Sequence, residues 1–176
     1  MNKNYLLLAV LVMLMNSSCI DSKKHMIRKL YGKTINLTWI TDYVGQSEEF
    51  IGNSDNSYLI VTKIDSSFCT PCTVNYLKAA ELFMEQLNND DIGFICIIQP
   101  KSLVDLENDI KNLNLSKLLL VLDQSDIYSK VNHLEQYNSL MSSFLLNQDS
   151  KIVGIGDPLR NSRVKSIFMD FVGNQK

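Results

Sequence analysis

Apolar residues follow two patterns along this chain: short continuous runs and stretches with helical spacing. Three runs of aliphatic residues cover 58–64, 92–98 and 117–122, as is typical of strands that are buried on both faces. Between the runs, apolar side chains recur every three or four residues over 71–88 and 103–113, which is the pattern of one face of an amphipathic helix. The first part of the chain therefore predicts the order β-α-β-α-β.

The second part predicts a short helix, a hairpin and a closing helix. Apolar positions over 127–134 have helical spacing. Two runs, 143–146 and 151–155, flank the polar turn 147–150, which predicts a β-hairpin. Apolar residues over 164–171 indicate a last helix. The complete order β-α-β-α-β-α-β-β-α predicts one α/β domain with a partly parallel sheet and helices on both faces.

Weaker patterns precede the first buried run. Residues 32–39 alternate weakly between polar and apolar, and we expect a short strand there. Residues 45–57 are polar and rich in Asn, Ser and Gly, which indicates a loop. Trp39, the only tryptophan, is interpreted as a core residue.

The beginning of the chain has the pattern of an export signal. A short polar start carries Lys3, residues 5–15 are apolar, and small residues precede Cys19; these are the three parts of a signal peptide. The apolar run is too short to cross a bilayer core of about 30 Å as a mature helix. A buried N-terminal helix or a short membrane anchor is the alternative.

The sequence that ends at Cys19 resembles a bacterial lipobox, in which the cysteine is lipidated and becomes the new N-terminus. It departs from the usual motif because Asn16 stands where Leu is common. We expect a signal peptide over 1–18, a lipidated cysteine and polar tether over 19–30, and a folded domain over 31–176. Lipid on this cysteine would anchor the chain in the bacterial cell envelope. The absence of an acidic run directly after it favours a site that faces the periplasm.

Composition narrows the possible functions. The 176 residues have a formal net charge of −2 without a polybasic run, so nucleic acid is not an expected partner. Cysteines occur at 19, 69, 72 and 96, too few to staple a chain of this size but enough for one redox pair. Outside the inner membrane the surroundings are oxidising, so a Cys69–Cys72 disulfide could persist there.

The candidate chemistry lies in Cys69-Thr70-Pro71-Cys72, between a predicted buried strand and a predicted helix. The unpaired N–H groups and the dipole at a helix N-terminus stabilise a thiolate and lower the pKa of a cysteine from about 8.5. Pro71 suits the first helical turn, where its missing N–H is not needed. We therefore interpret Cys69 as the exposed attacking thiol and Cys72 as the more buried resolving thiol, with Thr70 and Pro71 in support.

Three other interpretations of this dithiol stay open. A structural disulfide is one, although a four-residue loop restrains the unfolded chain little. Zinc is another, but it takes four ligands, and the chain adds only Cys96, His25 and His133, of which the cysteine lies in an apolar strand and is expected in the core. A copper carrier is the third, because soft thiolates and an imidazole suit copper.

The dithiol after strand 58–64, together with segment 143–153, resembles the thioredoxin-like superfamily. That segment is similar to the family's hairpin of the form S-F-F-L-I-D-x-D-G-K-I-V, and the resemblance covers about 33–172. The lipobox and residues 64–69 are similar to lipoproteins of Bacteroides-like bacteria. The resemblance implies a thioredoxin-like fold with a mixed central sheet flanked by helices on both faces. It also implies a membrane-tethered envelope oxidoreductase without a cofactor, acting on protein thiols or disulfides.

Several residues depart from that family's pattern. Ser142 occupies the position of its cis-proline, and because a non-proline cis bond costs about 3 kcal/mol we expect a trans peptide and altered docking of substrate. Lys63 replaces a buried polar or acidic residue, and it either reaches the sheet end or assists proton movement at Cys72. Phe68 replaces Trp. Asp65 is expected to cap a turn or to be exposed, with a general base as the alternative.

The leading hypothesis is thiol–disulfide exchange, in which Cys69 attacks a partner disulfide and Cys72 resolves the mixed disulfide. A thioredoxin-like binding lipoprotein with weak or no turnover is the second hypothesis. An envelope copper chaperone that uses both cysteines and His133 is the third. Peroxidase activity is a fourth, but it requires an arginine near Cys69, and the sequence places none there.

Overall fold

A computed structural model of the chain describes most of the expected domain. The described residues are 24–42, 57–87, 89, 91–110, 113, 115–137 and 142–173. The predicted signal peptide 1–18, Cys19 and nearly all of the predicted loop 45–57 lie outside them. Among the described residues, no helix is long and apolar enough to cross a membrane.

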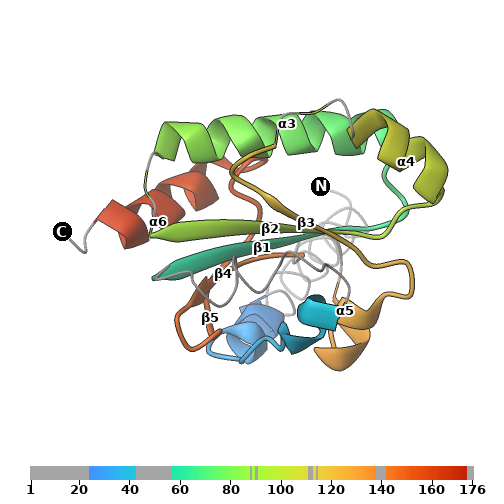
Figure 1. The fold of residues 1–176 in the computed structure, drawn as a ribbon. Coiled ribbons are helices and arrows are strands. Elements are labelled where there is room, and N and C mark those ends of the chain that lie inside the picture. The colour runs from blue at the N-terminus through green and yellow to red at the C-terminus, as the bar shows by residue number, and fades with distance from the viewer. Residues whose placement is uncertain are drawn as a thin grey trace, which may run out of the picture.

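A five-stranded mixed sheet forms the centre of the domain (Figure 1). Its strands are β1 (Tyr58–Ile64), β2 (Ile92–Ile98), β3 (Leu119–Leu122), β4 (Ser143–Asn147) and β5 (Ile152–Ile155). They lie in the order β3-β2-β1-β4-β5, with β1, β2 and β3 parallel and β4 antiparallel to both of its neighbours. The three apolar runs and the predicted hairpin are therefore confirmed as strands, and the fold class is α/β.

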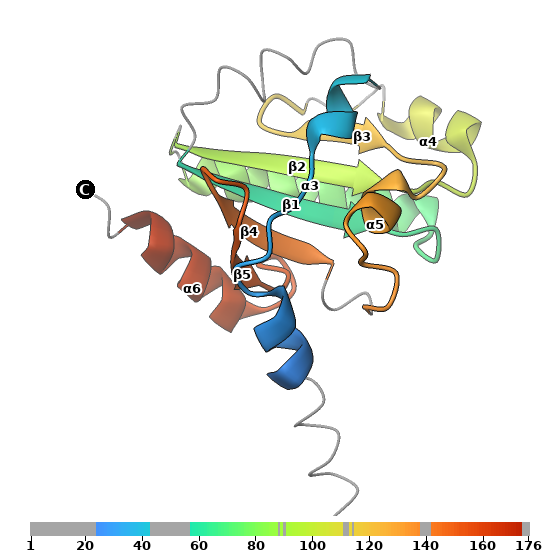
Figure 2. The ribbon, with the colours of Figure 1, turned by 90° about the horizontal axis from the view of Figure 1, so that it is seen from below.

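Helices cover both faces of the sheet, as the sequence predicts. They are α3 (Thr70–Leu87), α4 (Leu103–Ile110), α5 (Ile127–Val131), α6 (Ser162–Gly173) and the short 3₁₀ helix η1 (Thr38–Asp42). Figure 1 shows α3 and α4 above the sheet, with α5 and η1 below it. Seen from below, α5 and η1 lie in front of the strands (Figure 2).

Two apolar cores result, one on each face of the sheet. Side chains alternate along a strand, so Ile60 and Ile64 pack with α3 and Phe168 of α6. Val61 packs on the opposite face with Tyr128 of α5 and the N-terminal segment. β1 and β2 are buried on both faces, which explains why their sequences are continuous apolar runs instead of alternating ones.

The N-terminal segment differs from the prediction in two ways. Residues 24–30, expected to belong to a tether, are helical, because Leu30 is fully buried and Met26 packs against the core. Residues 32–39 do not form a strand. Ile35, Leu37 and Trp39 are buried at the edge of the core, as their alternation implies. The pairing of this segment with the sheet, however, is a single β-bridge.

That bridge joins Thr34 to Lys151 of the hairpin. Backbone hydrogen bonds flank the bridge, from the Gly32 N–H to the Ile152 carbonyl and from the Ile35 N–H to the Ser150 carbonyl, both at 2.8 Å. Side chains add two contacts: Asn132 Oδ1 accepts a hydrogen bond from the Asn36 N–H at 2.7 Å, and Lys33 Nζ donates to the Asn132 carbonyl. The segment is therefore joined to the hairpin by one bridge and its neighbouring backbone hydrogen bonds, and to the residues after α5 by side chains.

Glu81 is a buried acid in the middle of α3, with 6% exposure. Its Oε1 accepts hydrogen bonds from the Ser116 N–H at 2.8 Å, the Ser116 hydroxyl at 2.9 Å and the Lys117 N–H at 3.0 Å. A buried carboxylate is tolerated when donors surround it in this way. Glu81 therefore joins α3 to the segment that leads into β3.

Replacement of Glu81 tests this link. We expect Glu81→Ala to lower the free energy of unfolding by about 2 kcal/mol, because the hydrogen bonds of the buried carboxylate with Ser116 and Lys117 are lost. Urea unfolding measures the change. Glu85→Ala, at an exposed position of the same helix, is the matched control and should change stability by less than about 0.5 kcal/mol. Equal effects of the two variants would contradict the assigned role.

Candidate active site

Cys69 and Cys72 form a disulfide at the N-terminus of α3. The Cys69 carbonyl accepts the Thr73 N–H at 3.0 Å, which places Cys69 at the cap position of the helix. Its Sγ accepts the Cys72 N–H at 3.2 Å. An N–H of the first helical turn thus points at the sulfur that the sequence identifies as the attacking one, and the same N–H would stabilise a thiolate there.

Both cysteines are exposed, so Cys72 is not a buried thiol, and which of the two is the more buried stays a prediction. The buried face of α3 begins at Thr73 and continues through Tyr76 and Leu77, and Cys72 lies just outside it. Pro71 is exposed in the first helical turn, as predicted, and Thr70 is half-buried. Solvent therefore reaches both sulfur-bearing residues.

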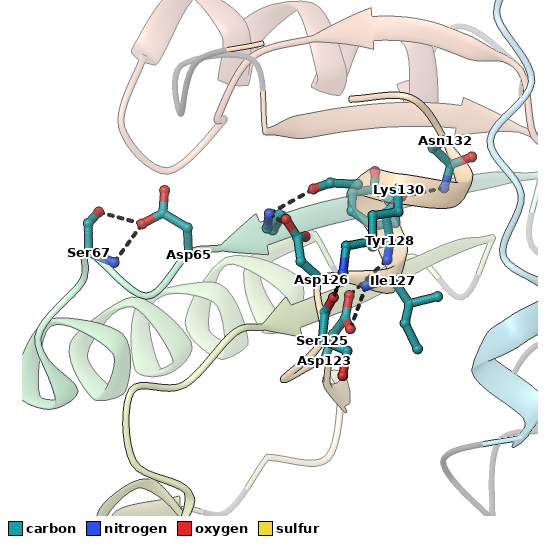
Figure 3. Close-up of polar contacts among 11 residues, drawn as sticks. Asp65, Ser67, Asp123, Ser125, Asp126, Ile127, Tyr128, Lys130 and Asn132 are labelled. Carbon is teal, nitrogen blue, oxygen red and sulfur yellow. Dashed lines mark hydrogen bonds and ion pairs between the residues drawn. The ribbon is translucent and has the colours of Figure 1, made fainter. Parts of the chain in front are cut away.

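The turn before the dithiol is closed by Asp65. Its Oδ1 accepts the Ser67 N–H at 2.8 Å and also the Ser67 hydroxyl, and its carbonyl accepts the Phe68 N–H at 3.1 Å. Figure 3 shows the Asp65 carboxylate turned toward Ser67 beyond the end of β1. These contacts are those of a residue that caps a turn, as the sequence predicts for Asp65.

A groove of about 320 Å³ opens beside Cys69. One wall is the dithiol turn with Phe68 and Thr73, and the other is the segment after β2 with Lys101 and Leu106. Apolar and polar residues line the groove together, and its charged lining residues are Asp65 and Lys101. It is large enough for a side chain or a short extended segment of a partner next to the disulfide.

Lys63 lies on the face of the sheet opposite α3. Its Nζ donates to Asp126 Oδ1 at 2.6 Å and to Ser129 Oγ at 2.7 Å, both on the α5 side, and its side chain is 14% exposed. The neighbouring Thr62 contacts Tyr76 of α3 instead. Side-chain alternation along β1 thus turns Lys63 away from the helix that carries the dithiol, which gives no support to proton transfer at Cys72.

Asp126, the acidic partner of Lys63, directly precedes α5. Figure 3 shows Asp126 there beside Asp123, whose carboxylate accepts the N–H groups of Ile127 and Tyr128 at 2.8 Å each. Burial tends to raise the pKa of Asp126, but the hydrogen bonds from Lys63 and Ser129 and the charge of Lys63 outweigh it, so the pKa lies below its usual value.

Ser142 lies where β4 meets β1. Its carbonyl accepts the Lys63 N–H at 3.0 Å, and next to it the Thr62 hydroxyl donates to Ser143 Oγ at 3.1 Å. Ser142 therefore continues the ladder between the two strands. The preceding residue, Met141, lies outside the described residues, so the expected trans peptide before Ser142 stays a prediction.

A loop after β5 brings Arg160 to Phe68, the residue before Cys69. The sequence did not reveal this contact. The Arg160 guanidinium carbon lies 4.4 Å from the centroid of the Phe68 ring and 5.6 Å from that of Tyr76. Its Nε lies 3.4 Å from Asp157 Oδ2. Asp157 Oδ1 in turn accepts the Leu159 N–H at 2.9 Å and the Tyr76 hydroxyl at 3.2 Å.

Gly156 permits this loop. Its φ of +122° is a conformation that a residue with a Cβ rarely adopts, and the sequence Gly156-Asp157-Pro158 after a predicted strand was the available turn signal. The signal locates the turn but not its contacts, because Arg160 and Phe68 are distant in sequence and only the packed sheet brings them together.

Cys96 is a core residue, as predicted, and is fully buried in β2. Burial raises the pKa of its thiol, and the nearby Asp157 carboxylate raises it further. Burial also raises the pKa of the Tyr76 hydroxyl, again with a contribution from Asp157. Both groups are therefore neutral at physiological pH, and Cys96 is unsuited to thiolate chemistry.

The described residues contain no group of three or more His, Cys, Asp or Glu side chains that could hold a metal ion. His133, which the copper alternative requires, is exposed at the end of α5. The copper and zinc interpretations thus gain no supporting cluster within the part of the chain that the structure describes.

Comparison with solved structures identifies the fold. A proposed thiol-disulfide oxidoreductase from Bacteroides vulgatus matches with a TM-score of 0.53 and 18% identity, over 70% of this chain and 78% of that one. A proposed thiol:disulfide interchange protein from Chlorobium tepidum matches with a TM-score of 0.50 and 10% identity, over 70% of this chain and 83% of that one. No family model and no curated protein matches the sequence.

The chain therefore has a thioredoxin-like fold, as the resemblance drawn from the dithiol and the hairpin implies. A second Bacteroides vulgatus structure, also described as a proposed thiol-disulfide oxidoreductase, agrees, with a TM-score of 0.50 and 16% identity over 69% of this chain and 82% of that one. At these identities the likeness concerns the fold, and the chemistry has to be argued from the site itself.

The Lys63–Asp126 pair predicts a dependence of stability on pH. Asp126→Asn should lower the free energy of unfolding at pH 7 on the order of 1–3 kcal/mol, because Lys63 keeps a poorly hydrated charge without its carboxylate. The folded-state pKa of Asp126 is lowered, so this contribution is complete above the unfolded value of about 3.9 and disappears as pH falls through the folded value.

Urea unfolding of both proteins between about pH 3 and pH 7 measures this difference. Asp149→Asn is the control, because Asp149 lies 3.5 Å from Lys151 in an exposed pair with 71% exposure and should have little effect. A stability difference for Asp126→Asn that stays constant down to pH 3 would show that the ion pair is not its source.

Proposed function

We propose that this protein is a thiol–disulfide oxidoreductase that exchanges disulfides with protein partners through Cys69 and Cys72. The observation that carries the proposal is the exposed Cys69–Cys72 disulfide at the N-terminus of α3. A structural cross-link would be expected in the core or across a long loop, where it restrains the unfolded chain most. An exposed pair that closes a four-residue loop is suited to reversible exchange.

The chemistry needs only the two sulfurs and a partner. In the reducing direction, the Cys69 thiolate attacks a partner disulfide, the partner's S–S bond breaks, and a mixed disulfide forms as one partner thiolate leaves. The Cys72 thiolate then attacks Cys69 Sγ, and the second partner thiolate leaves. Two electrons have passed to the partner, which takes up two protons, and the Cys69–Cys72 disulfide is restored.

The proposed location is the bacterial cell envelope, with the chain exported and anchored by lipid on Cys19. The signal-like pattern of residues 1–18 and the lipobox-like sequence support this location. An oxidising compartment is also one where a Cys69–Cys72 disulfide is a stable resting form. The periplasm-facing orientation follows from the same N-terminal pattern. A binding lipoprotein without turnover is the competing function, and Ser142 in the cis-proline position is what favours it.

A redox titration tests whether the dithiol is a working couple. We expect the purified protein, equilibrated in glutathione buffers and trapped with an alkylating reagent, to show a reversible Cys69–Cys72 transition between about −120 and −270 mV, the range of working members of the fold. Cys69→Ser and Cys72→Ser are the controls and should abolish it. A dithiol that stays fully oxidised or fully reduced throughout this range would refute exchange.

The order of attack can be tested by trapping. With a peptide disulfide as the partner, Cys72→Ser should accumulate a stable mixed disulfide at Cys69, because the resolving thiol is missing. Cys69→Ser should form the corresponding adduct at Cys72 more slowly, since its sulfur lacks the cap position. Mass spectrometry under non-reducing conditions measures both rates. Faster capture by Cys69→Ser would reverse the assignment of the two roles.

A further inference from the structure

A short amphipathic helix lies at the N-terminal edge of the domain. Residues 24–30 are helical, and the Tyr31 N–H donates to the Ile27 carbonyl at 3.0 Å, which continues the helical pattern by one residue. One side of this helix is held by the core, because Leu30 is fully buried and Met26 packs against it. Figure 2 shows the helix, in blue, at the edge of the domain. Its other side faces away from the core.

The outward side of this helix combines apolar and basic residues. Positions three or four apart are neighbours on one helix face. The outward face is therefore formed by Lys24, Ile27, Arg28 and Tyr31, and we call it the N-terminal face. Ile27 is 43% exposed and Tyr31 is 58% exposed, and both basic side chains are exposed as well. Packing of the domain does not require two large apolar side chains at these positions, since the core is served by the opposite side of the helix.

The charge around the N-terminal face has one sign. Segment 23–33 contains five Lys or Arg residues and no Asp or Glu, although the whole chain has a net charge of −2. The basic residues occur in pairs and single positions, and the helix gathers Lys24 and Arg28 on one side. The hairpin turn 147–150, which bonds to the residues after the helix, contains one acid, Asp149, and this acid pairs with Lys151 at 3.5 Å. The face is therefore complementary to an anionic surface.

The place of the helix in the sequence indicates which surface it would meet. Lys24 follows Cys19, the proposed site of lipid attachment, by five residues. An extended chain covers at most about 3.5 Å per residue, so the helix begins no more than about 17 Å from the lipidated residue. Lipid on Cys19 would therefore hold the N-terminal face close to the headgroups of the same membrane, where charge attraction acts over about 10 Å at 0.1 M salt.

We propose that the N-terminal face docks on the surface of a membrane that contains anionic lipids. Tyrosine is favoured at the level of the headgroups, the isoleucine side chain adds apolar contact, and the two cations attract anionic headgroups. The lipid would retain the protein at the membrane, and the face would fix the orientation of the domain, which a lipid and a short tether alone leave able to rotate. This inference extends the proposed location and does not depend on thiol–disulfide exchange.

Vesicle binding of the chain without its lipid tests the proposal. Residues 19–176 with Cys19→Ser contain every described residue and carry no lipid. We expect this protein to bind vesicles of phosphatidylcholine with about 30% phosphatidylglycerol at least about tenfold more tightly than vesicles of phosphatidylcholine alone. Binding should weaken as the NaCl concentration rises from about 0.05 to about 0.5 M, because salt screens the charges. Co-sedimentation with the vesicles measures the affinity.

Variants separate the two components of the N-terminal face. Lys24→Gln combined with Arg28→Gln should weaken binding to the anionic vesicles at least about tenfold, because each cation near such a surface contributes about fivefold. Ile27→Ser should weaken binding to the same vesicles severalfold, because it removes the apolar contact.

Matched controls make the same changes at other exposed positions. Lys78→Gln combined with Arg163→Gln removes two charges from α3 and α6, and Leu82→Ser removes an apolar side chain that is 56% exposed. Both controls should bind like the parent. Thermal unfolding of every variant shows that the fold is retained.

Selective loss of binding in the variants of the N-terminal face supports the inference. Absence of binding to the anionic vesicles, binding that salt does not weaken, or equal losses in the controls overturns it. Sedimentation velocity without vesicles examines the other occupant of such a face, and a dimer that Ile27→Ser dissociates would assign the face to a second copy of the chain and also overturn the inference.

The outcome is separate from that of the redox titration. A protein that binds anionic vesicles through the N-terminal face but shows no reversible Cys69–Cys72 couple would uphold this inference and refute the proposed exchange. A reversible couple in a protein that does not bind these vesicles would uphold exchange and refute membrane docking. Because the tested chain has no lipid, the reading also does not depend on whether Cys19 is modified.

Discussion

Side-chain alternation along β1 is the constraint on which the arrangement of the site depends. β1 is the central strand, with β2 and β4 as its neighbours and a packed layer on each face. Thr62 and Ile64 face α3, whereas Val61 and Lys63 face α5. A shift by one residue would exchange the two sets, placing a lysine under the dithiol helix and leaving Asp126 without its partner.

The order of elements could be predicted from the sequence because each element buries its own apolar residues, and such patterns are local. What the sequence did not reveal are polar residues whose partners are distant. Glu81 occupies a core position of α3 that periodicity assigns to an apolar residue, and only Ser116 and Lys117 explain it. Arg160 and Lys63 belong to the same class, since their partners lie on other elements.

The sequence Cys69-Thr70-Pro71-Cys72 lies between a run of buried apolar residues and a helical pattern. The dithiol and the helix N-terminus could therefore be located together. This motif did not predict the exposure of Cys72, which depends on the helix face that α3 turns to the sheet. That face begins at Thr73, one residue after Cys72. The same rotation gives Tyr76 its hydrogen bond to Asp157 and so helps to fix the loop that carries Arg160.

The exposure of Cys72 and the orientation of Lys63 fit one account of the site. A resolving thiol that is buried needs an internal group to take its proton, because a thiolate is costly to form in an apolar interior. An exposed thiol exchanges its proton with water directly, so an acid or base under the helix is not required. Lys63 is then free to serve the packing of α5, where its ammonium group pairs with Asp126.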